Sequence, residues 1–415
     1  MAPYLDDKIT LNNGDSHEEY LKAPEFQNFA KPPRILVIGA GSRGTAYAEA
    51  ALQGTNAVIT AVCEPIYSKR EAFGRKFIWT DKRLPAQSGQ HFSDWREWVE
   101  YEEERREHEA NQPGLESGID AVFVCVLDEM HEEVVCGIAH LGVDICCEKP
   151  MSTRMDSCIR MFKALNDAER GNAANGKKKP IFGICHVLRY SPHNMLLRHL
   201  VRDKEVVGDI LSVEHCEPVG WWHFSHSYVR GNWRKESTSA PSLLTNAKKI
   251  YLDKQLAQGN ADWPVKIVNP DIEDILGKRG PEAATAQLLS DLAEDYNTST
   301  PLEVRNKRNY FGRCVWESDN DVCDDQVVTL TWDDDGSDTS RSAKTALFHM
   351  IAHTEKQCER RGRIYGTKGE IEYDSTTITI YDFASGKTVS HKPHFAGGGH
   401  GGGDAGGVCG GGGED

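Results

Sequence analysis

Five short apolar runs recur in the first half of the chain, at residues 34–38, 58–63, 121–127, 144–147 and 181–187. Each run has the length of a buried strand, and stretches with helical spacing separate most of them, for example residues 132–140 and 157–169. Strands that alternate with helices form a doubly wound parallel sheet of the Rossmann type. The pattern therefore predicts an N-terminal α/β domain over residues 33–190.

Beyond residue 191 the pattern changes to longer strands in which polar and apolar positions alternate. Four such segments stand at residues 210–217, 326–332, 344–352 and 371–382. They predict a second, α+β domain over residues 191–396 with a large, open, mixed or antiparallel sheet. A chain of 415 residues is long enough for two such domains.

The two ends of the chain have a different composition from the domains. Residues 1–32 are polar and predict a flexible N-terminal arm. Residues 397–415 contain 12 glycines among 19 residues and predict a disordered tail, because such a segment buries too little apolar surface to offset its ordering entropy.

Three further features have ordinary interpretations. Residues 95–110 carry a run of charges and predict a solvated helical insertion with no binding role. The chain has 12 cysteines but no Cys-x-x-Cys pair, which favours reduced, mostly buried thiols. His349 and His353 are four residues apart, and a satisfied or exposed pair is the better interpretation than a zinc site. We therefore predict no metal.

The junction after the first strand carries the clearest chemical signal. Gly39, Gly41 and Gly44 follow the run 34–38 directly and precede a small, alanine-rich segment, residues 45–52, with helical character. Glycines at this spacing allow a tight turn, the approach of a pyrophosphate to the backbone, and close packing of helix on strand. The sequence therefore predicts a dinucleotide site at the turn formed by Gly39, Gly41, Ser42, Arg43 and Gly44.

An acidic residue, Glu64, ends the second apolar run. A carboxylate at this place accepts hydrogen bonds from the adenosine ribose and repels a 2′-phosphate, which favours NAD. Arg43, Lys69 and Arg70 lie close in sequence and could reverse the preference, so NADP stays open.

Composition limits the partners. The net charge of −15 argues against nucleic acid and anionic membrane surfaces, since both bind basic proteins. The N-terminus has no signal-peptide pattern, and no apolar run approaches the length of a membrane span. We expect a cytoplasmic protein with a small-molecule substrate; a homo-oligomer stays open.

Several motifs in order resemble one family. Cys147-Glu148-Lys149-Pro150 follows a strand, and together with the glycine turn, Glu64 and His131 it resembles the glucose–fructose oxidoreductase/inositol dehydrogenase/rhizopine-catabolism (Gfo/Idh/MocA) family. The segments 188–192, 229–234 and 364–370 look most like the branch named after a streptomycin-biosynthesis oxidoreductase. The resemblance covers residues 33–245 and 310–404.

The resemblance implies a nicotinamide cofactor in a cleft between a Rossmann domain and a mixed-sheet domain. His131, Glu148 and Lys149 would contact the cofactor, and Lys149 would be the catalytic residue. Alcohol oxidation requires removal of a proton from oxygen, which a lysine performs once burial and a neighbouring cation lower its pKa. The candidate contacts to a sugar or cyclitol substrate are Arg189, Tyr190, Trp233 and Arg234.

One departure from the family bears on activity. The family has a second catalytic residue, a histidine on a helix, after a segment that residues 241–245 resemble. Here Thr245 runs directly into Asn246, and no histidine occurs between His226 and His349. The simplest explanation is that a segment is missing between residues 245 and 246.

The sequence thus favours an NAD(P)-dependent oxidoreductase acting on a sugar or cyclitol hydroxyl, with the activity of this particular chain in question. An NAD-dependent glycosidase of the same fold is one alternative. A non-catalytic nucleotide-binding regulator is another, and the missing histidine favours it.

Overall fold

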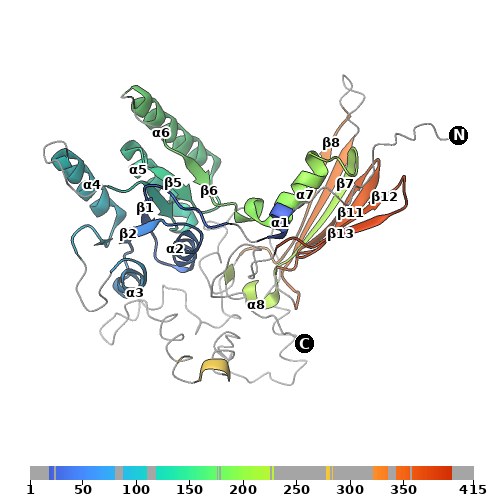
Figure 1. Cartoon of the computed structure of the whole chain (residues 1–415), viewed down its shortest axis with the longest axis horizontal. Coiled ribbons are helices and arrows are strands. Elements are labelled where there is room, and N and C mark those ends of the chain that lie inside the picture. Colours follow the sequence, from blue (N-terminus) through green and yellow to red (C-terminus); the bar gives the residue numbers. More distant parts are fainter. Residues whose placement is uncertain are drawn as a thin grey trace.

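The computed structural model contains two β-sheets, each with its own helices (Figure 1). The residues that the structure describes are 18–22, 25–79, 87–109, 118–174, 176, 179–224, 227–228, 277–280, 283, 321–334, 343–355 and 358–394.

The first sheet has six parallel strands in the order β3-β2-β1-β4-β5-β6. Its strands are β1 (Arg34–Ile38), β2 (Val58–Cys63), β3 (His91–Phe92), β4 (Ala121–Val124), β5 (Asp144–Cys147) and β6 (Phe182–Ile184). The order reverses between β1 and β4, as it does in a doubly wound sheet. The predicted Rossmann fold is confirmed, and the short edge strand β3 is an addition to the prediction.

Helices cover both faces of this sheet. They are α2 (Ser42–Gly54), α3 (Tyr67–Phe77), α4 (Trp95–Glu109), α5 (His131–Ile138) and α6 (Met155–Ala174), with short 3₁₀ turns at Asp128–Met130 and Ala139–Leu141. Alternate residues of β1 face opposite ways: Ile35 and Val37 join the core beneath α2 and α3, whereas Leu36 and Ile38 join the core beneath α4, α5 and α6.

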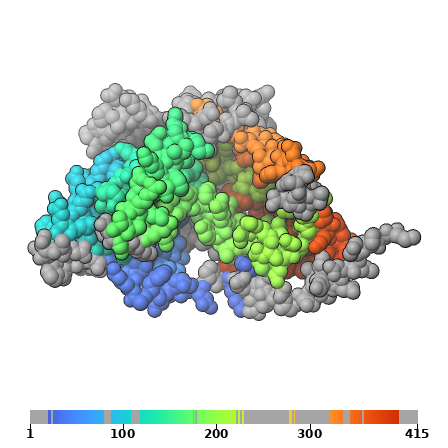
Figure 2. All heavy atoms as spheres, turned by 90° about the horizontal axis from the view of Figure 1, so that it is seen from above, coloured from blue at the N-terminus to red at the C-terminus, as the bar shows by residue number. Residues whose placement is uncertain are grey.

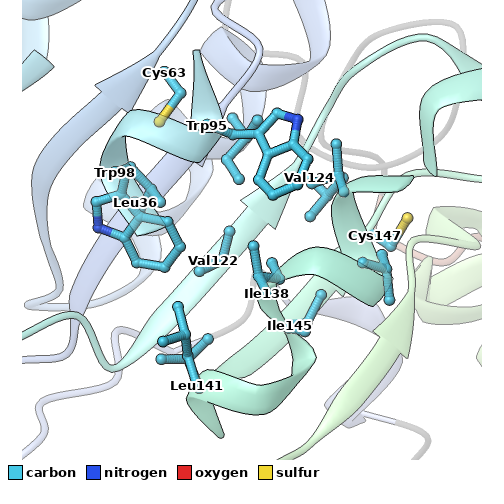
Figure 3. Packing of buried hydrophobic residues seen from close by; sticks show 14 of the residues in the cluster. Leu36, Cys63, Trp95, Trp98, Val122, Val124, Ile138, Leu141, Ile145 and Cys147 are labelled. Carbon is cyan, nitrogen blue, oxygen red and sulfur yellow. The ribbon is translucent and has the colours of Figure 1, made fainter. Parts of the chain in front are cut away.

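The structure corrects the prediction for residues 95–110. Residues 95–109 form helix α4, but Trp95 and Trp98 are buried and pack toward Val122 and Ile138 in the core of the sheet (Figure 3). Glu102 is only 1% exposed. The helix is therefore a covering layer of the Rossmann fold and not a solvated insertion; the dense charges of its outer face hid the two tryptophans.

The second sheet has seven strands in the order β13-β12-β11-β10-β7-β9-β8. They are β7 (Ile210–Pro218), β8 (Asp325–Trp332), β9 (Lys344–Ile351), β10 (Arg361–Gly366), β11 (Gly369–Tyr373), β12 (Ile378–Asp382) and β13 (Thr388–His391). Only the β7–β9 pairing is parallel. The predicted mixed, mostly antiparallel sheet is confirmed, and α7 (Pro192–Arg202) packs on it through Leu196 and Leu200.

One predicted strand, residues 371–382, is wrong in detail. It is two strands, β11 and β12, joined by a turn in which the Asp374 carboxylate accepts hydrogen bonds from the backbone N–H groups of Thr376 and Thr377, each at 2.7 Å. Buried residues on both sides of the turn form one continuous apolar pattern, which is why a single strand was predicted. Asp374 is the residue that could have indicated the turn, because aspartate is common in turns.

The described residues of the predicted N-terminal arm contact both domains. The short helix α1 (Glu18–Leu21) lies beside α7, where Tyr20 packs against the second core. The Gln27 N–H donates to the Gly54 carbonyl at 2.8 Å. The domain boundaries stay predictions, and the 245/246 junction and the tail lie outside the described residues.

Candidate functional site

The glycine turn joins β1 to α2, and two of its glycines are required by close packing. Gly39 has φ +97°, and a Cβ there would lie 2.5 Å from the carbonyl oxygen of Cys125 on the neighbouring chain segment. A Cβ on Gly44 would lie 2.0 Å from the carbonyl oxygen of Gly39. Any larger residue at either position would therefore push the helix away from the sheet.

Gly41 has the opposite surroundings. A Cβ there would meet nothing within 4 Å, so open space lies beside the backbone at the start of α2. This helix has 13 residues, its N-cap makes no side-chain hydrogen bond, and its first turn contains no acidic residue. The N-terminal N–H groups and the positive dipole end of α2 thus lie beside open space, and helix N-termini of this kind bind anions.

Glu64 lies at the end of β2 beside this turn and is only 7% exposed. Its Oε2 accepts a hydrogen bond from the Ala40 N–H at 2.9 Å, and its Oε1 accepts one from the Ile66 N–H at 3.0 Å. The carboxylate thus fixes the glycine turn relative to β2. Each oxygen keeps a second lone pair that a ribose hydroxyl can use.

Arg70, one of the cations that could favour NADP, is engaged elsewhere. Its Nη1 donates to the backbone carbonyl of Glu64, and its guanidinium lies over the Tyr67 ring at 5.5 Å from the centroid. These two contacts keep the guanidinium of Arg70 at the connection between β2 and α3.

Glu148 stands at the centre of a network that the sequence did not predict. Its Oε1 accepts a hydrogen bond from the Tyr47 hydroxyl of α2, and its Oε2 accepts one from the Lys149 N–H at 2.7 Å. Arg43 forms an ion pair with the same carboxylate at 3.9 Å. Burial and the Glu148 charge both raise the pKa of Tyr47 well above its ordinary value, so the hydroxyl stays protonated and donates.

His131 contacts the loop that contains Lys149 and Pro150. It is fully buried at the start of α5, and its Nδ1–H donates to the Pro150 carbonyl at 2.7 Å. The Lys149–Pro150 peptide bond is cis. His131, a predicted cofactor residue, is therefore hydrogen-bonded to the residue after Lys149, and the Lys149 side chain itself is exposed.

The second domain reaches the same site through α8 (Trp221–Phe224). Burial lowers the pKa of His223, and the positive charges of Arg43 and Lys149 lower it further. His223 of the second domain is thus close enough to Arg43 and Lys149 of the Rossmann domain to be affected by their charges. In the space-filling view, yellow-green atoms of the segment that contains α7 lie between the blue-to-green domain and the orange and red sheet (Figure 2).

The predicted substrate contacts are only partly described. Arg189 and Tyr190 lie in the 3₁₀ turn Val187–Tyr190 between the two domains, and both are exposed. Trp233 and Arg234 lie outside the described residues.

The histidine pair of the second sheet does not form one site. His349 is hydrogen-bonded to Asp325 at 2.9 Å, and His353 is hydrogen-bonded to Asp324 at 3.0 Å. Each histidine thus has its own carboxylate partner. Within the part of the chain that the structure describes, no group of three or more His, Cys, Asp or Glu residues is placed to hold a metal ion, and no helix there is long and apolar enough to cross a bilayer.

Comparison with known proteins agrees with the site. Residues 33–173 match the oxidoreductase family with an NAD-binding Rossmann fold, GFO_IDH_MocA. The matched residues include the glycine turn and Lys149, so the similarity covers the domain that carries the candidate site.

Individual relatives are distant. Inositol 2-dehydrogenase 2 of Saccharopolyspora erythraea is 28% identical over 83 residues, which is 20% of this chain and 22% of that protein. Levoglucosan dehydrogenase in complex with NADH and levoglucosan is 16% identical, with a TM-score of 0.52 over 90% of this chain and 82% of that one. An oxidoreductase from Sinorhizobium meliloti is 15% identical, with a TM-score of 0.50 over 87% and 78%. These structures share the two-sheet fold.

Proposed function

We propose that this chain has the site of an NAD-dependent dehydrogenase for a sugar or cyclitol hydroxyl. The observation that carries the proposal is the position of Lys149: its backbone is held by Glu148 at the carboxyl edge of the parallel sheet, and the same carboxylate is paired with Arg43 in the first turn of α2. Ligands of open α/β sheets bind at this edge, at the point where the strand order reverses.

The residues of the glycine turn fit the cofactor. The backbone at Gly41 and Ser42 would receive the pyrophosphate, because the space there is open and the helix N-terminus faces it. Glu64 would accept the ribose hydroxyls and repel a 2′-phosphate, while Arg70 is turned to the backbone of Glu64. We therefore assign NAD rather than NADP as the preferred nucleotide.

Bound NAD would supply the acceptor for a hydride from the substrate carbon. Lys149 would take the hydroxyl proton as general base, and the network of Glu148, Tyr47 and Arg43 would hold the lysine backbone in place. His131 would position the following proline loop. A lysine at the end of a strand whose neighbouring residues are all hydrogen-bonded is well oriented for this role.

The substrate class follows from the relatives and the candidate contacts. The similar proteins are described as inositol and levoglucosan dehydrogenases, both of which act on polyhydroxylated rings. Arg189 and Tyr190, exposed between the domains, supply a hydrogen-bonding cation and an aromatic face of the kind that binds sugars. Trp233 and Arg234 are proposed to complete the set.

Two finer proposals rest on sequence. The motifs at residues 188–192, 229–234 and 364–370 suggest the branch named after a streptomycin-biosynthesis oxidoreductase. The absence of histidine between His226 and His349 suggests that the catalytic partner of Lys149 is missing, so that the chain in this form binds nucleotide with little turnover. A nucleotide-binding regulator is the alternative that this absence favours.

Two measurements test the proposed site. Calorimetry should detect binding of NADH to the chain. The substitution Glu64→Gln keeps one hydrogen-bond acceptor but removes the negative charge, so it should reduce the ratio of NAD affinity to NADP affinity. In a version that restores the segment between Thr245 and Asn246, Lys149→Ala should lower kcat by about 10²–10⁴ with NADH affinity retained.

The matched control is Lys163→Ala, which removes an exposed lysine from α6. Equal turnover in Lys149→Ala and Lys163→Ala would refute the catalytic assignment. Absence of any NADH binding would refute the cofactor site.

A further inference from the structure

Two cysteines lie in contact beside the Tyr47–Glu148 network. Cys146 is in β5 and Cys185 follows β6, and their sulfur atoms are 3.1 Å apart. Cys146 is in register with Gly183, and Cys185 stands two residues further along the chain, so both side chains point to the same face of the sheet. A backbone hydrogen bond of 2.8 Å from Cys185 to Cys147 fixes this arrangement.

The two thiols differ in acidity. The hydrogen bond from Cys185 lowers the pKa of Cys146, whereas the same hydrogen bond and burial raise the pKa of Cys185. Burial also raises the pKa of the neighbouring thiols Cys125 and Cys147. Because the thiolate is the reactive form, Cys146, which is partly exposed, is the thiol of this group that an oxidant attacks.

The pair is connected to the proposed cofactor site. The Cys185 N–H donates to the Cys147 carbonyl at 2.8 Å, and Glu148, the next residue, accepts the N–H of Lys149. A movement of Cys185 is therefore passed through one backbone hydrogen bond to the residue that precedes Glu148.

We propose that Cys146 and Cys185 form a redox modification site, in which peroxide joins them as a disulfide that loosens the hold of Glu148 on the Lys149 loop. The consequence for nucleotide binding rests on the proposed function, whereas disulfide formation does not.

The chemistry balances with hydrogen peroxide as the two-electron oxidant. The Cys146 thiolate attacks one peroxide oxygen; the O–O bond breaks, Cys146 becomes a sulfenic acid, and the leaving hydroxide takes a proton to become water. The Cys185 sulfur then attacks the Cys146 sulfur. The S–S bond forms, the S–O bond breaks, and the departing hydroxide leaves as water with the Cys185 proton. A dithiol reverses the reaction by exchange.

The geometry explains why the disulfide would act on the site. The sulfur atoms must approach from 3.1 Å to a bond length of about 2.05 Å. This movement draws Cys185 toward β5, and it removes the S–H groups of both residues. The Cys147 carbonyl, which accepts the Cys185 N–H, and the adjoining Glu148 are then displaced with it.

The experiment treats the full chain with hydrogen peroxide and maps non-reduced peptides by mass spectrometry. We expect a Cys146–Cys185 cross-linked peptide that dithiothreitol removes. Oxidised protein should bind NADH about tenfold more weakly, and the Lys149 amide should exchange hydrogen faster. Cys146→Ser and Cys185→Ser should bind NADH normally and be insensitive to peroxide. Cys158→Ser, which removes a partly exposed cysteine of α6, should respond like the wild type.

Each outcome decides a separate point. Absence of the Cys146–Cys185 peptide, with other cysteines oxidised instead, would overturn the modification site. A disulfide without change in Lys149 amide exchange would overturn its connection to the loop. If reduced protein fails to bind NADH, the proposed function falls, and the peptide map and the amide exchange still decide this inference.

Discussion

The Tyr47 hydroxyl donates a hydrogen bond to Glu148, and this contact joins helix α2 to the loop that carries Lys149. Tyr47 is three residues beyond Gly44, so the same helix offers its N-terminus to a phosphate and its second turn to the proposed catalytic loop. Any displacement of α2 on cofactor binding would therefore reach Glu148 directly.

Tyr47→Phe should destabilise the fold. The substitution keeps the ring against Phe123 but leaves the buried Glu148 carboxylate without one donor. Hydrogen bonds to charged groups contribute about 1.5–3 kcal/mol, and we expect the free energy of unfolding in urea to fall by about that amount. Tyr381→Phe, on a partly exposed ring of β12, should have little effect. Equal stability of the two variants would show that Glu148 does not depend on Tyr47.

Gly41→Val should abolish nucleotide binding without unfolding the chain. The new side chain enters the open space beside the start of α2, where no protein atom lies within 4 Å, and it would exclude the pyrophosphate. Gly54→Val is the matched control, because Gly54 ends the same helix and is also surrounded by open space. Calorimetry with NADH should show affinity only in the wild type and in Gly54→Val. Retained affinity in Gly41→Val would place the phosphates elsewhere.

Glu102 should make the stability of the Rossmann domain sensitive to acid. Burial raises the pKa of this carboxyl, but hydrogen bonds from Arg105 and Arg106 outweigh burial and hold the pKa below the ordinary 4.5. A carboxyl with a lowered folded-state pKa stabilises the fold above its unfolded pKa and loses this contribution as the pH falls through its folded value. We therefore expect the free energy of unfolding to fall as the pH drops below about 4.5.

Glu102→Gln removes that ionisation and should flatten the stability curve between about pH 3 and pH 7, at a lower overall stability because Arg105 and Arg106 lose their charged partner. Glu104→Gln, an exposed neighbour on the same helix, is the control. Unfolding curves at several pH values make the comparison. Parallel pH dependence in wild type and Glu102→Gln would contradict the assignment.

The sequence predicted what local patterns encode. Gly39, Gly41 and Gly44 lie within six residues of one another, and their spacing, together with the strand before them and the helix after them, identified the turn. The apolar runs likewise identified most strands of both sheets, but not β3, β10 or β13. These patterns are strong because a central strand needs apolar residues for its own burial, whichever elements pack against it.

The Tyr47–Glu148 contact could not be predicted in this way. The two residues are 101 positions apart, and Tyr47 is an ordinary member of an alanine-rich helix until the fold brings it to β5. For the same reason, the general expectation of reduced, mostly buried thiols did not pair Cys146 with Cys185, which is 39 positions away. Contacts between strand ends depend on register, which single-sequence patterns specify only indirectly.

The chain as given should bind NADH yet oxidise polyols very slowly. Gly39, Gly41, Gly44 and Glu64 are all in place for the nucleotide, so affinity need not depend on residues beyond 245. Removal of the substrate proton should be slow, because no histidine occurs from residue 227 to residue 348. Such a histidine would share proton removal with Lys149 or orient the substrate hydroxyl.

The decisive measurement is a side-by-side assay of this chain and a version with the segment between Thr245 and Asn246 restored, on a panel of sugars and cyclitols. Removal of a general acid–base partner lowers kcat by about 10²–10⁴, so NADH production should differ by that factor while calorimetric NADH affinity stays equal. His223, whose pKa is lowered by burial and by the charges of Arg43 and Lys149, is the histidine to test as a substitute. Comparable turnover by both versions, lost in His223→Asn, would mean that no segment is missing and that His223 is the partner of Lys149.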